Sequence, residues 1–137
     1  MPVAETIRPE DVLVGLLAEV RLREGDRFRA DPVTVHSQFY KWREDPKFSD
    51  LFREFVFDTR DYFPYSETLD RAFDGLQLAG YLERTNPRGT YYVITPTILK
   101  LFEEHIRSRF TASQLGALEA LAGQFAEGIK TEGHAGA

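Results

Sequence analysis

Over residues 66–79 the apolar positions recur at i, i+3, i+4, i+7 and i+10, a spacing that places them on one face of a helix. They are Leu69, Ala72, Phe73, Leu76 and Ala79. Ser66 precedes them as an N-cap, whose hydroxyl accepts a hydrogen bond from a free backbone amide. Gly80 follows them at the position where helices commonly end in a left-handed residue. The pattern predicts a helix that begins at Ser66 and stops at Gly80.

The pattern then changes to that of strands. Tyr81 and Leu82 open an extended run that reaches Asn-Pro-Arg-Gly at residues 86–89, in which proline presets φ and asparagine bonds back to the turn. Residues 90–95, Thr-Tyr-Tyr-Val-Ile-Thr, are rich in β-branched and aromatic side chains. The sequence therefore predicts a β-hairpin over 81–95. It also predicts a helix over 96–109, with Thr95 as N-cap and Pro96 in its first turn.

Three helical patterns precede this helix and hairpin. One begins at Pro9 and ends near Gly25, a second follows Asp31-Pro32, and a third follows Asp45-Pro46, where proline occupies the first turn. The third is predicted to be the helix that pairs with residues 66–79. Residues 21–29 carry four arginines, which predict a cationic helix end in solvent or a contact with phosphate or an acidic partner.

The last helical pattern covers residues 111–130 and begins at a capping box of Thr111 and Gln114. Glycines at 116, 123 and 128 favour a close approach by another helix, since each one weakens an exposed helix by about 1 kcal/mol relative to alanine. We expect this helix to form a homodimer interface. The expected interface residues are Leu115, Leu118, Leu121, Ala122, Phe125 and Ile129. One domain is expected over residues 1–130, and residues 131–137 are predicted to be a disordered tail.

Ten of the eighteen aromatic residues lie between Phe39 and Tyr65. The helical spacing of Phe48, Phe52 and Phe55 favours a core made of bulky rings. Interleaved basic residues favour the alternative, a stacking surface for single-stranded nucleic acid. The aromatic content alone leaves both interpretations open.

The composition of the chain argues against several kinds of catalytic and metal-binding site. The 137 residues include no cysteine, which excludes disulfides and thiolate catalysis, and the histidines at 36, 105 and 134 lack the spacing of paired metal ligands. His36 is predicted to lie on a helix surface or at its boundary. No phosphate-binding glycine loop or nucleophile motif occurs, so we expect neither enzyme activity nor a cofactor. No run approaches membrane-spanning length, and a cytoplasmic protein is expected.

The helix ending at Ala79-Gly80, the Asn-Pro-Arg-Gly turn and the Thr95-Pro96 restart resemble the layout of bacterial and archaeal winged helix-turn-helix regulators. The pattern is similar to MarR-like and PadR-like proteins and, more faintly, to the Panacea-type domains of antitoxin-like proteins. The resemblance implies a mainly α fold with a small β-hairpin wing and additional N- and C-terminal helices. It also implies contacts to DNA or a partner through the second helix of the pair and the wing. These contact residues are Glu67, Thr68, Asp70, Arg71, Asp74, Gln77, Arg84 and Arg88.

Charge separates two functional hypotheses. The formal net charge is −5, and the six contact residues on helix 66–79 include three acids and one arginine. Acidic side chains oppose the phosphate attraction that supplies most non-specific DNA affinity. The leading hypothesis is therefore a non-catalytic module that binds a protein partner, with a regulatory or antitoxin-like role. The alternative is a DNA-binding transcriptional regulator that uses helix 66–79 and wing 81–95.

Overall fold

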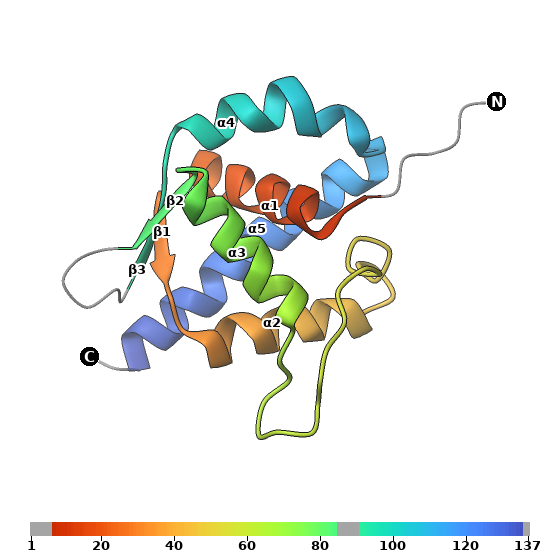
Figure 1. Ribbon diagram of the computed structural model, residues 1–137, viewed down its shortest axis with the longest axis vertical. Coiled ribbons are helices and arrows are strands. Elements are labelled where there is room, and N and C mark those ends of the chain that lie inside the picture. The colour runs from red at the N-terminus through yellow and green to blue at the C-terminus, as the bar shows by residue number, and fades with distance from the viewer. Residues whose placement is uncertain (1–6, 85–90, 136–137) are drawn as a thin grey trace.

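The computed structural model describes residues 7–84 and 91–135, and the side chains up to residue 126. Five α-helices and a small antiparallel sheet make a mainly helical α+β fold, as the sequence predicts at this level (Figure 1). The elements in order are α1 (Pro9–Arg23), β1 (Arg27–Arg29), α2 (Pro32–Glu44), α3 (Glu67–Leu78), β2 (Leu82–Arg84), β3 (Tyr91–Ile94), α4 (Thr97–Leu101) and α5 (Ala112–Ala135). A π-helical segment, Phe102–Ile106, and a 3-10 turn, Arg107–Arg109, join α4 to α5.

The three strands lie in the order β1-β3-β2. Strands β2 and β3 pair antiparallel, with Leu82 opposite Ile94, which confirms the two predicted strands of the hairpin. The predicted turn at 86–89 lies outside the described residues. Gly80 ends the preceding helix with φ +86°, as expected from its position.

Strand β1 corrects the prediction that residues 21–29 form a cationic helix end. Helix α1 stops at Arg23, Gly25 takes φ +140°, and Arg27–Arg29 then pairs with β3. The Arg-Phe-Arg sequence alternates as a strand does, with Phe28 only 2% exposed between two more accessible arginines. A run of three residues is too short to give a period from sequence alone, so pairing with β3 decides its conformation.

The segment after Asp45-Pro46 is not the predicted helix. It is a series of turns with backbone bonds from Phe48 to Asp45, from Leu51 to Phe48 and from Phe55 to Phe52. Of the five apolar residues expected on one face only Val56 is exposed, and the other four are nevertheless buried: Phe48, Leu51, Phe52 and Phe55. Their rings pack on α2, where Phe39 lies 5.5 Å from Phe52 and 5.8 Å from Phe55. Side-chain packing holds this segment without a regular helix, and α2 is the helix that precedes α3. Half of the ten aromatic residues therefore supply core, as one of the two interpretations predicts, whereas Tyr62 is exposed.

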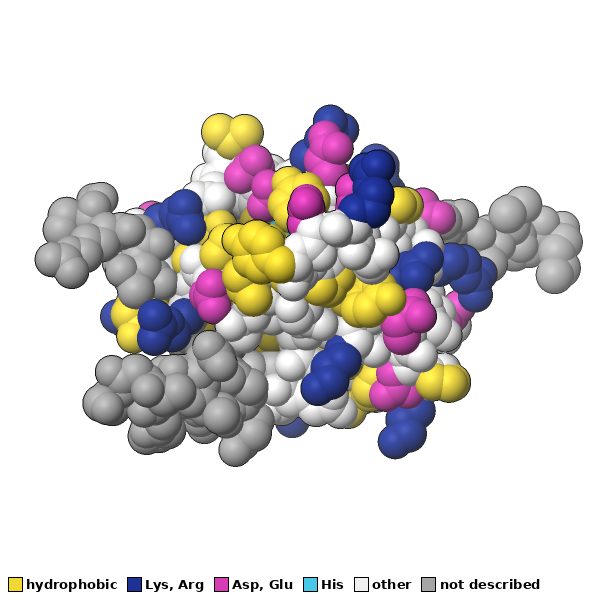
Figure 2. All heavy atoms as spheres, turned by 90° about the horizontal axis from the view of Figure 1, so that it is seen from below, with side chains coloured by type: hydrophobic (Ala, Val, Ile, Leu, Met, Phe, Trp, Pro, Cys, Tyr) yellow, Lys and Arg dark blue, Asp and Glu magenta, His cyan; other side chains and the backbone are white. Residues whose placement is uncertain are grey.

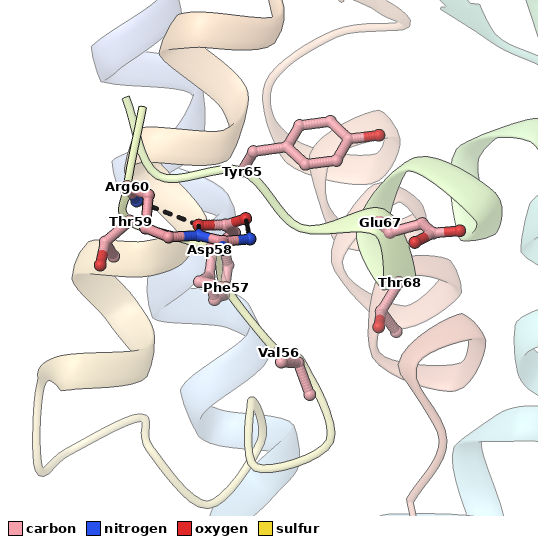
Figure 3. A pocket seen from close by; sticks show the side chains of 8 residues that line it. All are labelled: Val56, Phe57, Asp58, Thr59, Arg60, Tyr65, Glu67 and Thr68. Carbon is pink, nitrogen blue, oxygen red and sulfur yellow. Dashed lines mark hydrogen bonds and ion pairs between the residues drawn. The ribbon is translucent and has the colours of Figure 1, made fainter. Parts of the chain in front are cut away.

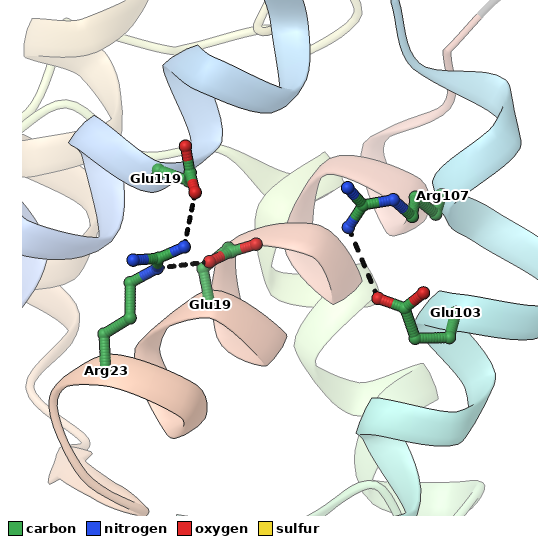
Figure 4. Close-up of polar contacts among 5 residues, drawn as sticks. All are labelled: Glu19, Arg23, Glu103, Arg107 and Glu119. Atoms are coloured by element: carbon green, nitrogen blue, oxygen red, sulfur yellow. Dashed lines mark hydrogen bonds and ion pairs between the residues drawn. The ribbon is translucent and has the colours of Figure 1, made fainter. Parts of the chain in front are cut away.

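Helix α1 runs through the middle of the molecule, between α3 and α5 (Figure 1). Residues 11–20 are all buried, which is typical of a helix covered on every side. Two of them are carboxylates, and each has a cationic partner. Asp11 accepts from Arg109 at 3.0 Å, and Glu19 accepts from Arg23 at 2.6 Å. Arg23 also donates to Glu119 of α5, which ties the two helices together at the surface (Figure 4).

Helix α5 corrects the expected dimer interface. Four of its six predicted residues are buried inside the same chain, in the core shared with α1 and β1: Leu118, Leu121, Ala122 and Phe125. Leu115 is partly buried against this core, and the side chain of Ile129 is not described. An amphipathic terminal helix looks alike in sequence whether its apolar face meets a second copy or its own chain. The four buried side chains belong to the monomer core.

The segment 97–111 differs from expectation at its start and agrees with it at its end. Thr95 donates its hydroxyl to the Gly80 carbonyl at 2.8 Å instead of capping the helix, and Pro96 occupies the cap position. The capping box is confirmed, because Thr111 N–H donates to Gln114 at 2.8 Å and Gln114 N–H donates to the Thr111 hydroxyl at 3.1 Å. Helix α5 continues past residue 130 to Ala135.

Candidate functional site

Helix α3 is held at its start by two buried hydrogen bonds to Ser66. The Ser66 hydroxyl accepts from Leu69 N–H at 3.1 Å, which confirms the predicted N-cap. The Ser66 backbone N–H donates to Nδ1 of His36, on α2, at 3.0 Å. The first turn of α3 is thus fixed both by its own cap and by the neighbouring helix.

Replacement Ser66→Ala should lower the free energy of unfolding by about 1 kcal/mol, because it leaves the Leu69 amide without its cap. Ser113→Ala is a matched control, since Ser113 is exposed in the first turn of α5. Urea unfolding followed by the fluorescence of Trp42, the single tryptophan, measures both variants. Equal midpoints for the two variants would show that the cap contributes nothing.

Helix α3 buries one face and exposes the other. Leu69, Ala72, Phe73 and Leu76 are buried, as the spacing predicted. The opposite side, here called the α3 face, consists of Glu67, Asp70, Arg71 and Asp74, all exposed. Arg71 pairs with Glu67 at 2.5 Å. Among the described residues, neither Asp70 nor Asp74 forms an ion pair with a lysine or an arginine. The Asp70 carboxylate lies 3.8 Å from the His36 ring.

Beside this face lies a cavity of about 250 Å³, here called the α2–α3 cavity, between the start of α2, α3 and the sheet. It brings together four of the predicted contact residues: Asp70, Asp74, Gln77 and Arg84. Three residues that the sequence did not predict as contacts also line it: Asp31, His36 and Tyr92. The charged side chains are three carboxylates and one guanidinium, which gives the cavity an acidic balance.

The single guanidinium of the cavity contacts a ring instead of a carboxylate. Arg84 lies over the ring of Tyr92, 5.1 Å from its centroid, a geometry suited to a cation–π interaction. Burial raises the pKa of the Tyr92 hydroxyl; Arg84 opposes this change, and Asp74 and Asp70 add to it. Within the described part of the chain, Arg84 forms no ion pair with Asp70 or Asp74.

His36 corrects the prediction of a surface or boundary position, since it is only 2% exposed. Its ring is stacked on Tyr65, with centroids 4.9 Å apart, and Tyr65 in turn donates its hydroxyl to Asp70 at 2.9 Å. Burial lowers the pKa of His36, and the charge of Asp70 acts in the opposite direction. His36 follows Val35 and precedes Phe39 by one turn on α2, and this helical spacing beside buried residues was the signal for its burial.

The other described contact residues of α3 line different grooves from the α2–α3 cavity. Glu67 and Thr68 border an open groove of about 570 Å³ whose far wall is the chain at 56–60 (Figure 3). Within that wall Arg60 donates to Asp58 at 2.7 Å, and hydrogen bonds from Arg60 lower the pKa of Asp58 to about 2. Arg71 borders a further groove of about 250 Å³ against the start of α1. Arg88 lies outside the described residues.

The face that carries α2 and the chain at 56–65 has basic and acidic side chains interspersed with hydrophobic ones, without a continuous basic surface (Figure 2). Among the described residues, no group of three or more histidines and carboxylates is placed to hold a metal ion. None of the described helices combines the length and apolarity needed to cross a membrane. Comparison with known proteins found no family model, curated protein or solved structure that matches the chain.

Proposed function

We propose that the chain is a non-catalytic winged-helix module that binds a protein partner through α3. Three features support the fold assignment: the order α1, β1, α2, α3, β2, β3, the sheet order β1-β3-β2, and a hairpin that directly follows α3. In helix-turn-helix domains the second helix of the pair is the recognition element. Here that helix is α3, and its outer side is exposed.

The observation that carries the choice of partner is the uncompensated acidity of α3. Asp70 and Asp74 are exposed one turn apart, and Asp31 adds a third carboxylate across the α2–α3 cavity. Complementary charge selects partners and accelerates their encounter. The partner that fits is a lysine- or arginine-rich protein segment lying along the α3 face. A regulatory or antitoxin-like role is consistent with such a module.

A lysine-rich peptide labelled with a fluorophore tests this proposal by fluorescence anisotropy at low and moderate salt. We expect salt-sensitive binding, because exposed charges are screened over about 10 Å at 0.1 M ionic strength. The double replacement Asp70→Asn and Asp74→Asn should weaken binding roughly tenfold, since each exposed ion pair contributes up to about 1 kcal/mol.

Glu104→Gln is the control, because Glu104 is exposed on the π-helical segment and its loss also removes one negative charge. A second peptide, with every lysine replaced by glutamine, should bind neither protein. Because the double variant removes two negative charges, a weakening by Glu104→Gln of half its free-energy effect would show that only net charge matters. No binding of the lysine-rich peptide at low salt would remove α3 as a docking surface for basic segments.

The alternative function is a DNA-binding transcriptional regulator that uses helix 66–79 and wing 81–95. The observation in its favour is the basic character of the sheet, where Arg27 and Arg29 of β1 and Arg84 of β2 flank the central strand β3. Random-sequence duplex DNA in the same anisotropy experiment distinguishes the two. Tight, salt-sensitive DNA binding that Arg84→Ala weakens would favour the regulator.

A homodimer also stays a proposal. The core residues of α5 are engaged within the chain, so its interface would use other surfaces. Light scattering of the purified protein measures the oligomeric state directly.

A further inference from the structure

His36 is held in a way that requires its neutral form. Its Nδ1 accepts the Ser66 backbone N–H at 3.0 Å, and a backbone amide can only donate. The accepting nitrogen therefore carries no proton, and the ring proton resides on Nε2. Because Ser66 is also the N-cap of α3, one neutral imidazole fixes the start of the exposed helix.

The other side of the ring faces a group that favours the charged form. Nε2 lies 3.8 Å from Oδ1 of Asp70, which is longer than a hydrogen bond, and the Asp70 carboxylate is also bonded to the Tyr65 hydroxyl at 2.9 Å. A short rotation of either side chain brings imidazolium and carboxylate into an ion pair. The ring thus lies between a contact that only the neutral form makes and a carboxylate that attracts the cation.

We propose that His36 is a pH-sensitive switch that sets the position of the first turn of α3. Protonation of Nδ1 removes the lone pair that accepts from Ser66 and places two N–H groups against each other. The hydrogen bond breaks, the imidazolium pairs with Asp70, and the segment Tyr65–Ser66 is released from α2. The first turn of α3 carries Glu67 and Asp70, so mild acid changes the α3 face.

The groups around His36 determine the pH at which its ring becomes protonated. Burial opposes charge on the ring and lowers the pKa of His36. Tyr65 stacks on the ring, and the charged or titratable groups that line the same cavity are Asp70 and Asp74 from α3, Asp31 at the start of α2, and Arg84 and Tyr92 from the sheet. The charge of Asp70 is the one that favours the imidazolium among these groups.

The free energy of unfolding should also depend on the protonation of His36. The ordinary pKa of histidine is 6.5, and that of His36 is lower in the folded chain, so the unfolded chain binds more protons below pH 6.5. The contribution of neutral His36 to stability is fully present above pH 6.5. It is lost progressively as the pH falls below 6.5 through the folded-state pKa.

Nuclear magnetic resonance of the uniformly ¹⁵N-labelled chain tests the switch without any partner. At pH 7.5 we expect an unprotonated Nδ1 and a scalar coupling across the hydrogen bond from Ser66 to His36. On acidification the coupling should disappear, and the Ser66 and Leu69 amide signals should shift with the midpoint of His36, below pH 6.5. A protonated Nδ1 at pH 7.5, or Ser66 and Leu69 signals that ignore the titration of His36, would overturn the proposal.

His36→Asn retains an acceptor near the position of Nδ1 but gains no charge, so the pH response of Ser66 and Leu69 should vanish. His105→Asn is the matched control, because the side chain of His105 is 68% exposed on the π-helical segment, and it should leave the response intact. If His36→Asn does not fold, Asp70→Asn provides the test. This variant lacks the carboxylate that attracts the imidazolium, so the titration midpoint of His36 should move to lower pH. An unchanged midpoint would contradict the role given to Asp70.

That the change at His36 alters docking to the α3 face rests on the proposed function. Binding of the lysine-rich peptide, measured at a pH above and a pH below the His36 midpoint, distinguishes the two proposals. An intact spectroscopic response without peptide binding at either pH contradicts only the docking surface. Peptide binding without a response at Ser66 contradicts only the switch.

Discussion

Phe125→Ala should lower the free energy of unfolding by about 3–5 kcal/mol, the typical cost of removing a buried phenylalanine ring. Phe125 is 2% exposed and its ring lies 5.1 Å from that of Phe28 and 6.1 Å from that of Trp42. These neighbours come from β1 and α2, so the ring joins α5 to two elements that lie far from it in sequence. Because native domains are stable by only about 5–15 kcal/mol, this single change removes a large share of the total.

Urea unfolding monitored by Trp42 fluorescence measures the effect, with Phe125→Leu as the control. Leucine keeps most of the buried volume and should cost less than about 2 kcal/mol. The experiment also decides between the core and the interface positions of this ring. A Phe125→Ala protein with an unchanged urea midpoint and a reduced mass by light scattering would place the ring between two copies of the chain.

Gly15→Leu should destabilise the fold by roughly 3 kcal/mol, because α1 has no room for a side chain at this position. A Cβ atom there would lie 2.7 Å from Cδ1 of Leu118 and 3.3 Å from Cε1 of Phe102. Both neighbours are themselves buried, so neither has free space into which to move. The expected result is a large decrease in the urea midpoint or a chain that does not fold.

Gly116→Leu is the matched control on α5. No atom lies within 4 Å of a Cβ built at Gly116, and leucine is a better helix former than glycine by up to about 1 kcal/mol. This variant should be neutral or more stable than the parent. Similar destabilisation by both substitutions would show that the effect at Gly15 comes from helix propensity and not from the close packing of α1 on α5.

The glycines also show where sequence reasoning failed and why. The sequence favoured close helix packing at Gly116 and Gly123, yet both are open, and the close approach occurs at Gly15. A glycine in a helix has the same local cost wherever it lies. Which glycine meets another helix depends on how the helices are placed, and that information is not local.

The residues of the candidate site also include some that the sequence identified and some that it missed. The exposed positions of α3 followed from its 3.6-residue period, and the structure places Asp70, Asp74, Gln77 and Arg84 around one cavity. Asp31, His36 and Tyr92 complete that cavity from α2 and β3. They were missed because each lies on an element whose position relative to α3 is set by core packing.

Local signals were sufficient for the elements with strong end residues. Ser66, Gly80 and the Thr111–Gln114 box each act through hydrogen bonds or backbone angles within a few residues, so the sequence by itself determined where α3 begins and ends and where α5 starts. Long-range packing decided the rest. It made a strand of Arg27–Arg29, held 46–54 in turns around the aromatic core, buried the apolar face of α5 within the monomer and enclosed His36. In each of these cases the side chains meet partners distant along the chain, and only the tertiary structure brings those partners together.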